Sequence, residues 1–201
     1  QTTQMVVGAD NETDQDVILM ADRHYKEFKL KRVYYSGYIP INTEEKALPA
    51  VGTAPPLLRE NRLYQSDWLM RFYGFEANEI VNNQHPNLDL EVDPKLSWAL
   101  RNPEQFPVDI NKADYRMILR VPGIGVRSAK KIVSARRFGK IHIDQLKRMG
   151  VAYNRAQHFI RCADTPQFIK DLMPSQIRHQ ILQGGQSKYT SQLSPQLGLG
   201  F

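Results

Sequence analysis

The sequence predicts an α+β protein in which a β-strand, a helix and a second β-strand at the N-terminus precede a domain made of helices alone. Three observations lead to this prediction. Two short β-branched runs flank a segment with helical apolar spacing, the second half is strongly basic, and two similar glycine turns follow each other there. With 201 residues, of which 41% are hydrophobic and 24% charged, the chain has the composition of a globular protein.

The N-terminal unit is predicted from local patterns. Residues 5–9 form an apolar run typical of a buried strand. Thr13 suits a helix N-cap, with Asp16 at the reciprocal position of a capping box, and the apolar stripe continues to about Lys29. Residues 32–37 are β-branched and aromatic, as in a second strand. Together they predict a βαβ unit with parallel strands, whose sheet edges require neighbouring strands.

The remaining elements suggest four parts. Residues 1–82 comprise the βαβ unit, a proline-rich crossing loop and a covering helix at 63–73 that ends at Gly74. Residues 83–104 contain a linker and a connecting helix near 94–101. Residues 105–173 hold two helical hairpins, and residues 174–201 form a polar tail that we expect to be extended or flexible.

The charge is unevenly distributed. Residues 101–161 contain 14 Lys and Arg against four Asp and Glu, whereas residues 1–100 contain 10 against 15. Such a basic block is typical of proteins that bind a polyanion. No apolar run could cross a bilayer or serve as a signal peptide, so we expect a cytoplasmic protein without membrane contact.

Residues 111–132 match the helix-hairpin-helix pattern. Asn111 is predicted to cap the first helix, with Asp114 in its first turn, and Pro122 ends it. The turn that follows has Gly123 and Gly125, which permit a tight bend and leave the backbone open to a phosphate. Its middle residue is apolar and should pack between the helices, and the start of the second helix offers N–H groups to an anion.

The second helix carries a polar stripe that suits phosphate oxygens, which position a protein without reading base sequence. The predicted nucleic-acid contacts of the first hairpin are Gly123, Ile124, Gly125, Arg127, Ser128, Lys130, Lys131, Arg136 and Arg137. The alternative is that the hairpin only packs.

A degraded copy of the motif follows 27 residues later. Leu119, Gly123, Ile124, Ala129 and Ile132 correspond to Leu146, Gly150, Val151, Ala156 and Phe159. Met149 replaces the proline and Ala152 the second glycine. Gly150, Asn154 and Arg155 are further predicted nucleic-acid contacts, although a degenerate copy is as often structural. Two hairpins related by a pseudo-twofold axis could follow both strands of a duplex.

Other candidate residues have simpler interpretations. No metal site is expected, because the histidines show no ligand spacing and the lone Cys162 suits a small packing residue. The aromatic cluster Trp68, Phe72, Tyr73 and Phe75 has helical spacing, which favours core packing over a base-stacking platform.

Several segments, together with the hairpin, resemble the C-terminal half of a family of DNA-modification or repair radical S-adenosylmethionine proteins. They are residues 3–9, 31–36, 55–69 and 106–111, and the resemblance extends from Thr3 to about Phe168. It implies that the βαβ unit is the last part of a radical-enzyme α/β barrel, with Gln4, Gly8 and Ser36 lining a cofactor site. It also implies a full-length enzyme with a [4Fe–4S] cluster and S-adenosylmethionine.

This chain lacks the family's C-x3-C-x2-C motif, which holds the cluster through three thiolates. The resemblance therefore implies a missing N-terminal barrel half, and no cofactor or catalysis is expected of this chain alone. Its expected partner is DNA, double-stranded by preference, with RNA left open.

Two alternatives differ in class. One is a non-catalytic nucleic-acid-binding or scaffold module. The other is a relative of base-excision DNA glycosylases, for which Asp144 lies near the expected catalytic position. Arg127 and Ser128, however, stand where such enzymes often have a lysine, and no helical barrel is predicted to enclose a flipped base.

Overall fold

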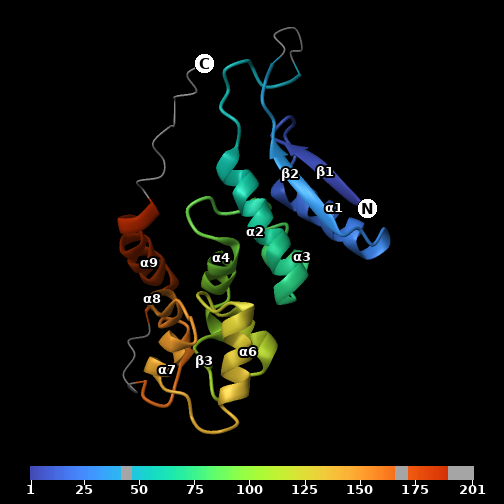
Figure 1. Ribbon diagram of the computed structural model, residues 1–201. Coiled ribbons are helices and arrows are strands. Elements are labelled where there is room, and N and C mark those ends of the chain that lie inside the picture. The colour runs from blue at the N-terminus through green and yellow to red at the C-terminus, as the bar shows by residue number, and fades with distance from the viewer. Residues whose placement is uncertain (42–46, 166–171, 190–201) are drawn as a thin grey trace, which may run out of the picture.

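The computed structural model describes residues 1–41, 47–165 and 172–189, with side chains described up to residue 184. It combines helices with two small parallel sheets (Figure 1). This agrees with the predicted α+β class at that level, and one buried apolar cluster runs from the N-terminal strands to the last helix. Within the described residues no helix is long and apolar enough to cross a membrane.

The N-terminal βαβ unit is confirmed. Strands β1 (Thr2–Val7) and β2 (Arg32–Gly37) pair in parallel in the register Thr2↔Arg32 to Val7↔Gly37, with helix α1 (Asp14–Glu27) between them. The predicted capping box is present: the Thr13 side chain accepts from the backbone of Asp16, whose carboxylate accepts from the backbone of Thr13. The local sequence therefore determines where helix α1 begins.

The two edges of this sheet differ, contrary to the prediction that both require neighbouring strands. At the outer edge of β2, the backbone N–H groups of Val33 and Tyr35 donate to the hydroxyls of Tyr25 and Tyr64, at 2.9 and 3.0 Å. The Glu60 carboxylate accepts from the backbone N–H of Gly37, further along the same edge, at 2.8 Å. Side chains of α1 and of the following helix thus close the β2 edge and satisfy its backbone.

Helix α2 (Leu57–Tyr73) begins six residues earlier than predicted and ends at Gly74, whose φ of 67° is the left-handed conformation that favours glycine. The short helix α3 (Ala77–Ile80) follows it. Leu63 and Leu69 of α2 are buried in the core.

The segment predicted as a linker packs into the protein. The backbone N–H of Leu88 donates to the buried carboxylate of Asp14, 2.8 Å away, so this segment is tied to the start of α1. Helix α4 (Pro94–Arg101) has the predicted bounds, and its Leu96 and Trp98 are buried. It contacts α2, α3 and α9 and so connects the N-terminal unit with the hairpins.

The hairpin region contains one 3-10 turn, four helices and two short strands. They are η1 (Pro103–Gln105), β3 (Val108–Asp109), α5 (Tyr115–Arg120), α6 (Val126–Ala135), α7 (Ile143–Arg148), α8 (Tyr153–Ala156) and β4 (Ile160–Arg161). Strands β3 and β4 pair in parallel, so the prediction of an all-helical domain was wrong in this detail. The pairing ties the segment before the first hairpin to the segment after the second.

The prediction of an extended tail from residue 174 was wrong for its first part. Residues Pro174–Tyr189 form helix α9, which lies against α4 (Figure 1). Ile177 is buried there, and Arg178 forms ion pairs with Asp89 and Glu91. Residues 190–201 lie outside the described part.

Candidate nucleic-acid interface

The first hairpin begins three residues later than predicted. Helix α5 is capped by Asp114, whose carboxylate accepts from the backbone N–H of Met117 at 2.8 Å, and not by Asn111. The Asn111 amide instead bonds both backbone groups of Ile141, at 2.8 and 3.3 Å. Asn111 therefore joins the segments that precede the two hairpins, while Asp114 caps helix α5.

The two glycines of the turn have different surroundings. Gly123 has a φ of 87°, and a Cβ there would meet the Ala152 carbonyl oxygen at 2.6 Å, so only glycine fits. Gly125 has an ordinary φ of −94°, and a Cβ there would meet only the Tyr73 hydroxyl, 3.6 Å away. Gly123 is thus needed where the hairpins touch, whereas Gly125 keeps the mouth of the turn open.

Ile124 is buried between these glycines, as predicted for the packing residue. Its carbonyl oxygen accepts a 2.6 Å hydrogen bond from Lys95 Nζ, which lies 4.8 Å from the centre of the Tyr73 ring. Lys95 is buried, and burial lowers its pKa to about 7 despite attraction by Asp93. A buried lysine thus holds the turn from the inside.

The start of α6 offers donors to an anion. Gly125, its N-cap residue, has no side chain to cap the helix, and within the described residues the backbone N–H groups of Arg127 and Ser128 donate to no acceptor. The turn's carbonyls are already engaged, since the Gly123 oxygen accepts from the Ala152 N–H at 2.9 Å. The donors left over, at the positive end of a ten-residue helix, are suited to a phosphate.

The exposed basic residues of this hairpin continue along α6. Arg127, Lys130, Lys131 and Arg137 are exposed, and none forms an ion pair with a residue that the structure describes. Arg120, by contrast, is paired with Glu79 at 2.7 Å. Unneutralised charge is therefore present along α6 and just beyond its end, beside the open turn, and Arg116, Lys140 and Arg148 are further exposed cations without an ion pair among the described residues.

Four of the predicted contacts have internal partners. Ile124 is buried, and the buried Ser128 hydroxyl donates to the Met149 carbonyl at 3.1 Å. The Arg136 guanidinium donates to backbone carbonyls that precede α5, at 3.1 Å from the Ile110 oxygen. Arg155 pairs with Asp93. These side chains assemble the hairpins and leave the outer surface to the unpaired cations.

The second hairpin repeats the backbone of the first. Gly150 has a φ of 86°, matching the 87° of Gly123, and the five predicted pairs of equivalent apolar and glycine positions place every apolar member in the core. Its second helix, α8, is however only four residues long. Ala152 replaces the open glycine, and its N–H is already bonded to the first turn.

The three residues suggested for a cofactor site lie at the sheet. Gln4 Nε2 donates to Ser36 Oγ at 2.9 Å, on the sheet face opposite to the buried Val7. The Gly8 N–H donates to Glu12 at 2.8 Å, and a Cβ on Gly8 would approach Pro56 to 2.9 Å. Gln4 and Ser36 are thus adjacent, while Gly8 lies at the crossing of the chain.

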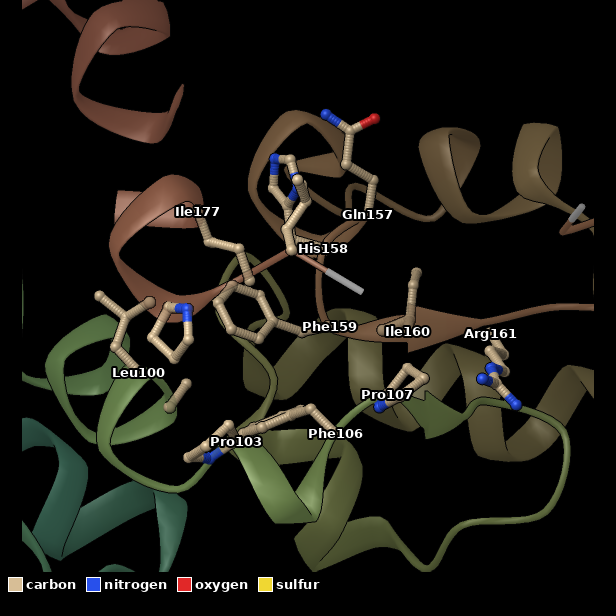
Figure 2. Close-up of a pocket in the computed structure, with 13 residues that line it drawn as sticks. Leu100, Pro103, Phe106, Pro107, Gln157, His158, Phe159, Ile160, Arg161 and Ile177 are labelled. Atoms are coloured by element: carbon tan, nitrogen blue, oxygen red, sulfur yellow. The ribbon is translucent and has the colours of Figure 1, made fainter. Parts of the chain in front are cut away.

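An apolar cavity of about 220 Å³ lies elsewhere, between α4, β4 and α9 (Figure 2). Leu100, Phe159 and Ile177 point toward one another across it. No carboxylate lines it, and burial lowers the pKa of its His158. No residue of the first turn contributes to it. Among the described residues there is also no group of three or more potential metal ligands.

Comparison with known proteins agrees with the hairpin assignment. Residues 104–158, just over a quarter of the chain, match the family described as helix-hairpin-helix motif. No curated protein and no solved structure matches the chain. The match covers both hairpin turns and the whole basic helix α6. The chain therefore contains a helix-hairpin-helix motif, a unit associated with nucleic-acid binding.

Sequence reasoning missed two features beside the turn. One is Lys95, because no local pattern shows that this lysine is buried. Its partner, the Ile124 carbonyl, lies 29 positions away in the sequence. The predicted core position is wrong for Trp68 and Phe72, which are exposed, whereas Phe75 is buried. Their helical spacing indicated a shared face of α2 but not what covers it.

Proposed function

We propose that this chain binds nucleic acid, with DNA duplex as the main ligand, by gripping the sugar-phosphate backbone with its first hairpin. The observation that carries the proposal is the combination at one turn: an open glycine, uncommitted helix-start N–H groups and an unpaired cationic stripe. Phosphate is the chemical group that suits all three. Binding should therefore depend little on sequence and strongly on salt.

The test is a titration of unrelated duplexes at two salt concentrations. Arg127→Glu/Lys131→Glu should weaken binding strongly and reduce the salt slope by about two, one for each lost phosphate contact. Lys29→Glu/Lys31→Glu is the matched control, because both lysines are exposed, form no ion pair among the described residues and lie in the N-terminal unit. Equal slopes for the two variants, or a strong preference for one sequence, would contradict the proposal.

We also propose that the chain is the DNA-engaging half of a larger radical S-adenosylmethionine enzyme. The resemblance suggests this, and the sheet edges support it: side chains close the β2 edge, and no backbone partner lies at the outer edge of β1 among the described residues. Further parallel strands would therefore join at β1. The polar face with Gln4 and Ser36 would then line the barrel's interior.

The residues present do not fit an iron–sulfur cluster, because the chain's one cysteine, Cys162, cannot supply three thiolates. The cluster would be held by residues outside this sequence. Reading the gene upstream of Gln1 tests the proposal. A C-x3-C-x2-C triplet in frame would support it, and its absence would leave a nucleic-acid-binding module without this chemistry.

A further inference from the structure

Two large aromatic side chains on α2 are exposed side by side. Trp68 and Phe72 are 54% and 45% exposed, and their ring centroids are 4.6 Å apart. Phe75, a few residues later, is by contrast buried against Trp98. An adjacent exposed pair of rings leaves contiguous apolar surface in water, and such surface is a common feature of binding sites.

The pair lies beside the mouth of the first hairpin, and Tyr73 connects the two. The Tyr73 hydroxyl is 3.6 Å from the position that a Cβ on Gly125 would occupy. The Val126 backbone and the Trp68 side chain also lie close enough to this hydroxyl to lower its pKa, against the larger rise caused by burial. Tyr73 thus lies between the indole and the start of α6, where the open donors are.

The chemistry of the surroundings favours a nucleobase as the occupant. The Arg71 guanidinium lies 4.9 Å from the Phe72 ring centroid, so a cation already contacts one ring of the pair. The exposed cations of α6 begin at Arg127, two residues after the Gly125 position that Tyr73 approaches. A ligand that is both polyanionic and rich in flat apolar faces matches this combination, whereas an apolar protein segment would not complement the charge.

We infer that Trp68 and Phe72 form a stacking platform for one unpaired base of a nucleic acid whose backbone lies on the first hairpin. The inference rests on the proposed function. Bases inside an intact duplex have both faces covered, so only a bulged, terminal or extruded base can occupy the platform. The protein should therefore prefer a duplex with an unpaired base to a fully paired one.

The experiment compares a paired duplex with the same duplex carrying one bulged adenine. The wild type should bind the bulged duplex about 10-fold more tightly. Trp68→Ala/Phe72→Ala should lose this preference but keep the affinity and salt slope for the paired duplex. Leu57→Ala/Leu58→Ala is the control on the same helix, where both leucines are also exposed, and should behave as wild type.

Tryptophan fluorescence supplies a second readout. Trp98 is buried, so quenching by the bulged duplex should come from Trp68. Trp68→Phe should keep the preference, since phenylalanine also stacks, while losing this quenching. Equal affinity of the wild type for both duplexes, or a preference that survives Trp68→Ala/Phe72→Ala, overturns the inference. Failure of the proposed function is distinct, since the paired duplex would then show no salt-dependent binding at all.

Discussion

The two hairpins share a backbone plan and differ in what they leave exposed. Both turns contain a glycine in the left-handed conformation, and both place an apolar residue, Ile124 or Val151, in the core. Only the first has a ten-residue second helix with an open glycine before it. In the second, α8 has four residues, and Ala152 uses its N–H to bond the first turn.

This difference suggests that the two copies have different roles: both pack in the core, but the first has the features suited to binding a phosphate. Gly123 and Ser128 on the first hairpin contact Ala152 and Met149 on the second, so each copy completes the core of the other. The combination of an open glycine and a long second helix with free N–H donors occurs on the first copy. We therefore expect the second hairpin to act mainly as the support on which the first is built, although Gly150, Asn154 and Arg155 stay predicted contacts.

The largest effect should come from breaking what the copies share. Ile124→Asp and Val151→Asp each place an unpaired carboxylate in the core, and each should destabilise the protein by at least about 3 kcal/mol. Chemical denaturation followed by circular dichroism measures this. If Val151→Asp left stability unchanged, the second hairpin would not be the support that its buried residues indicate.

A pH-dependent effect of intermediate size should arise at Lys95, which anchors only the first turn. Its folded pKa of about 7 lies below the value of about 10.4 expected for an unfolded lysine. Between these values the unfolded chain binds one more proton, so the free energy of unfolding rises with pH by up to about 1.4 kcal/mol per unit. Below pH 7 both states are protonated, and the cost of burying the ammonium group is fully present.

Lys95→Met isolates this contribution, because other titrating groups largely cancel in the difference between the two proteins. Urea unfolding of both proteins at about pH 6.5 and about pH 8.5 should show the wild type gaining stability relative to the variant at the higher pH. A difference that does not change with pH would indicate that Lys95 keeps an ordinary pKa in the folded protein.

The sequence predicted those parts of the structure that depend on neighbouring residues. The Thr13 capping box, strand Arg32–Gly37, helix Pro94–Arg101 and the left-handed Gly74 all follow from patterns within a few positions. The 27-residue repeat was also visible, because left-handed glycines and buried apolar residues recur at fixed spacing.

The remainder depends on contacts between distant segments. Helix α9 has a largely polar sequence, and it is attached by the buried Ile177 and by Arg178, which reaches Asp89 and Glu91. Asp114 outcompeted Asn111 as a helix cap because the asparagine amide is used by Ile141, 30 positions away. At the candidate interface, no local pattern indicates that Ser128 would face Met149. Partners so far apart in the sequence are brought together only by the fold, so local patterns do not predict them.

The smallest predicted effect distinguishes the two turns most directly. Gly125→Ala gives the first turn the residue that the second has at Ala152, and the backbone tolerates it, since φ is −94° and the nearest atom to the new methyl is 3.6 Å away. The methyl group would crowd a phosphate at the mouth, so affinity for a paired duplex should fall about 10-fold, as expected for one charge-assisted hydrogen bond. The reciprocal Ala152→Gly should gain nothing, because that N–H already donates to the Gly123 carbonyl. Fluorescence anisotropy with one duplex at one salt concentration measures both variants. Equal losses, or a gain for Ala152→Gly, would mean that the two turns contact the backbone alike.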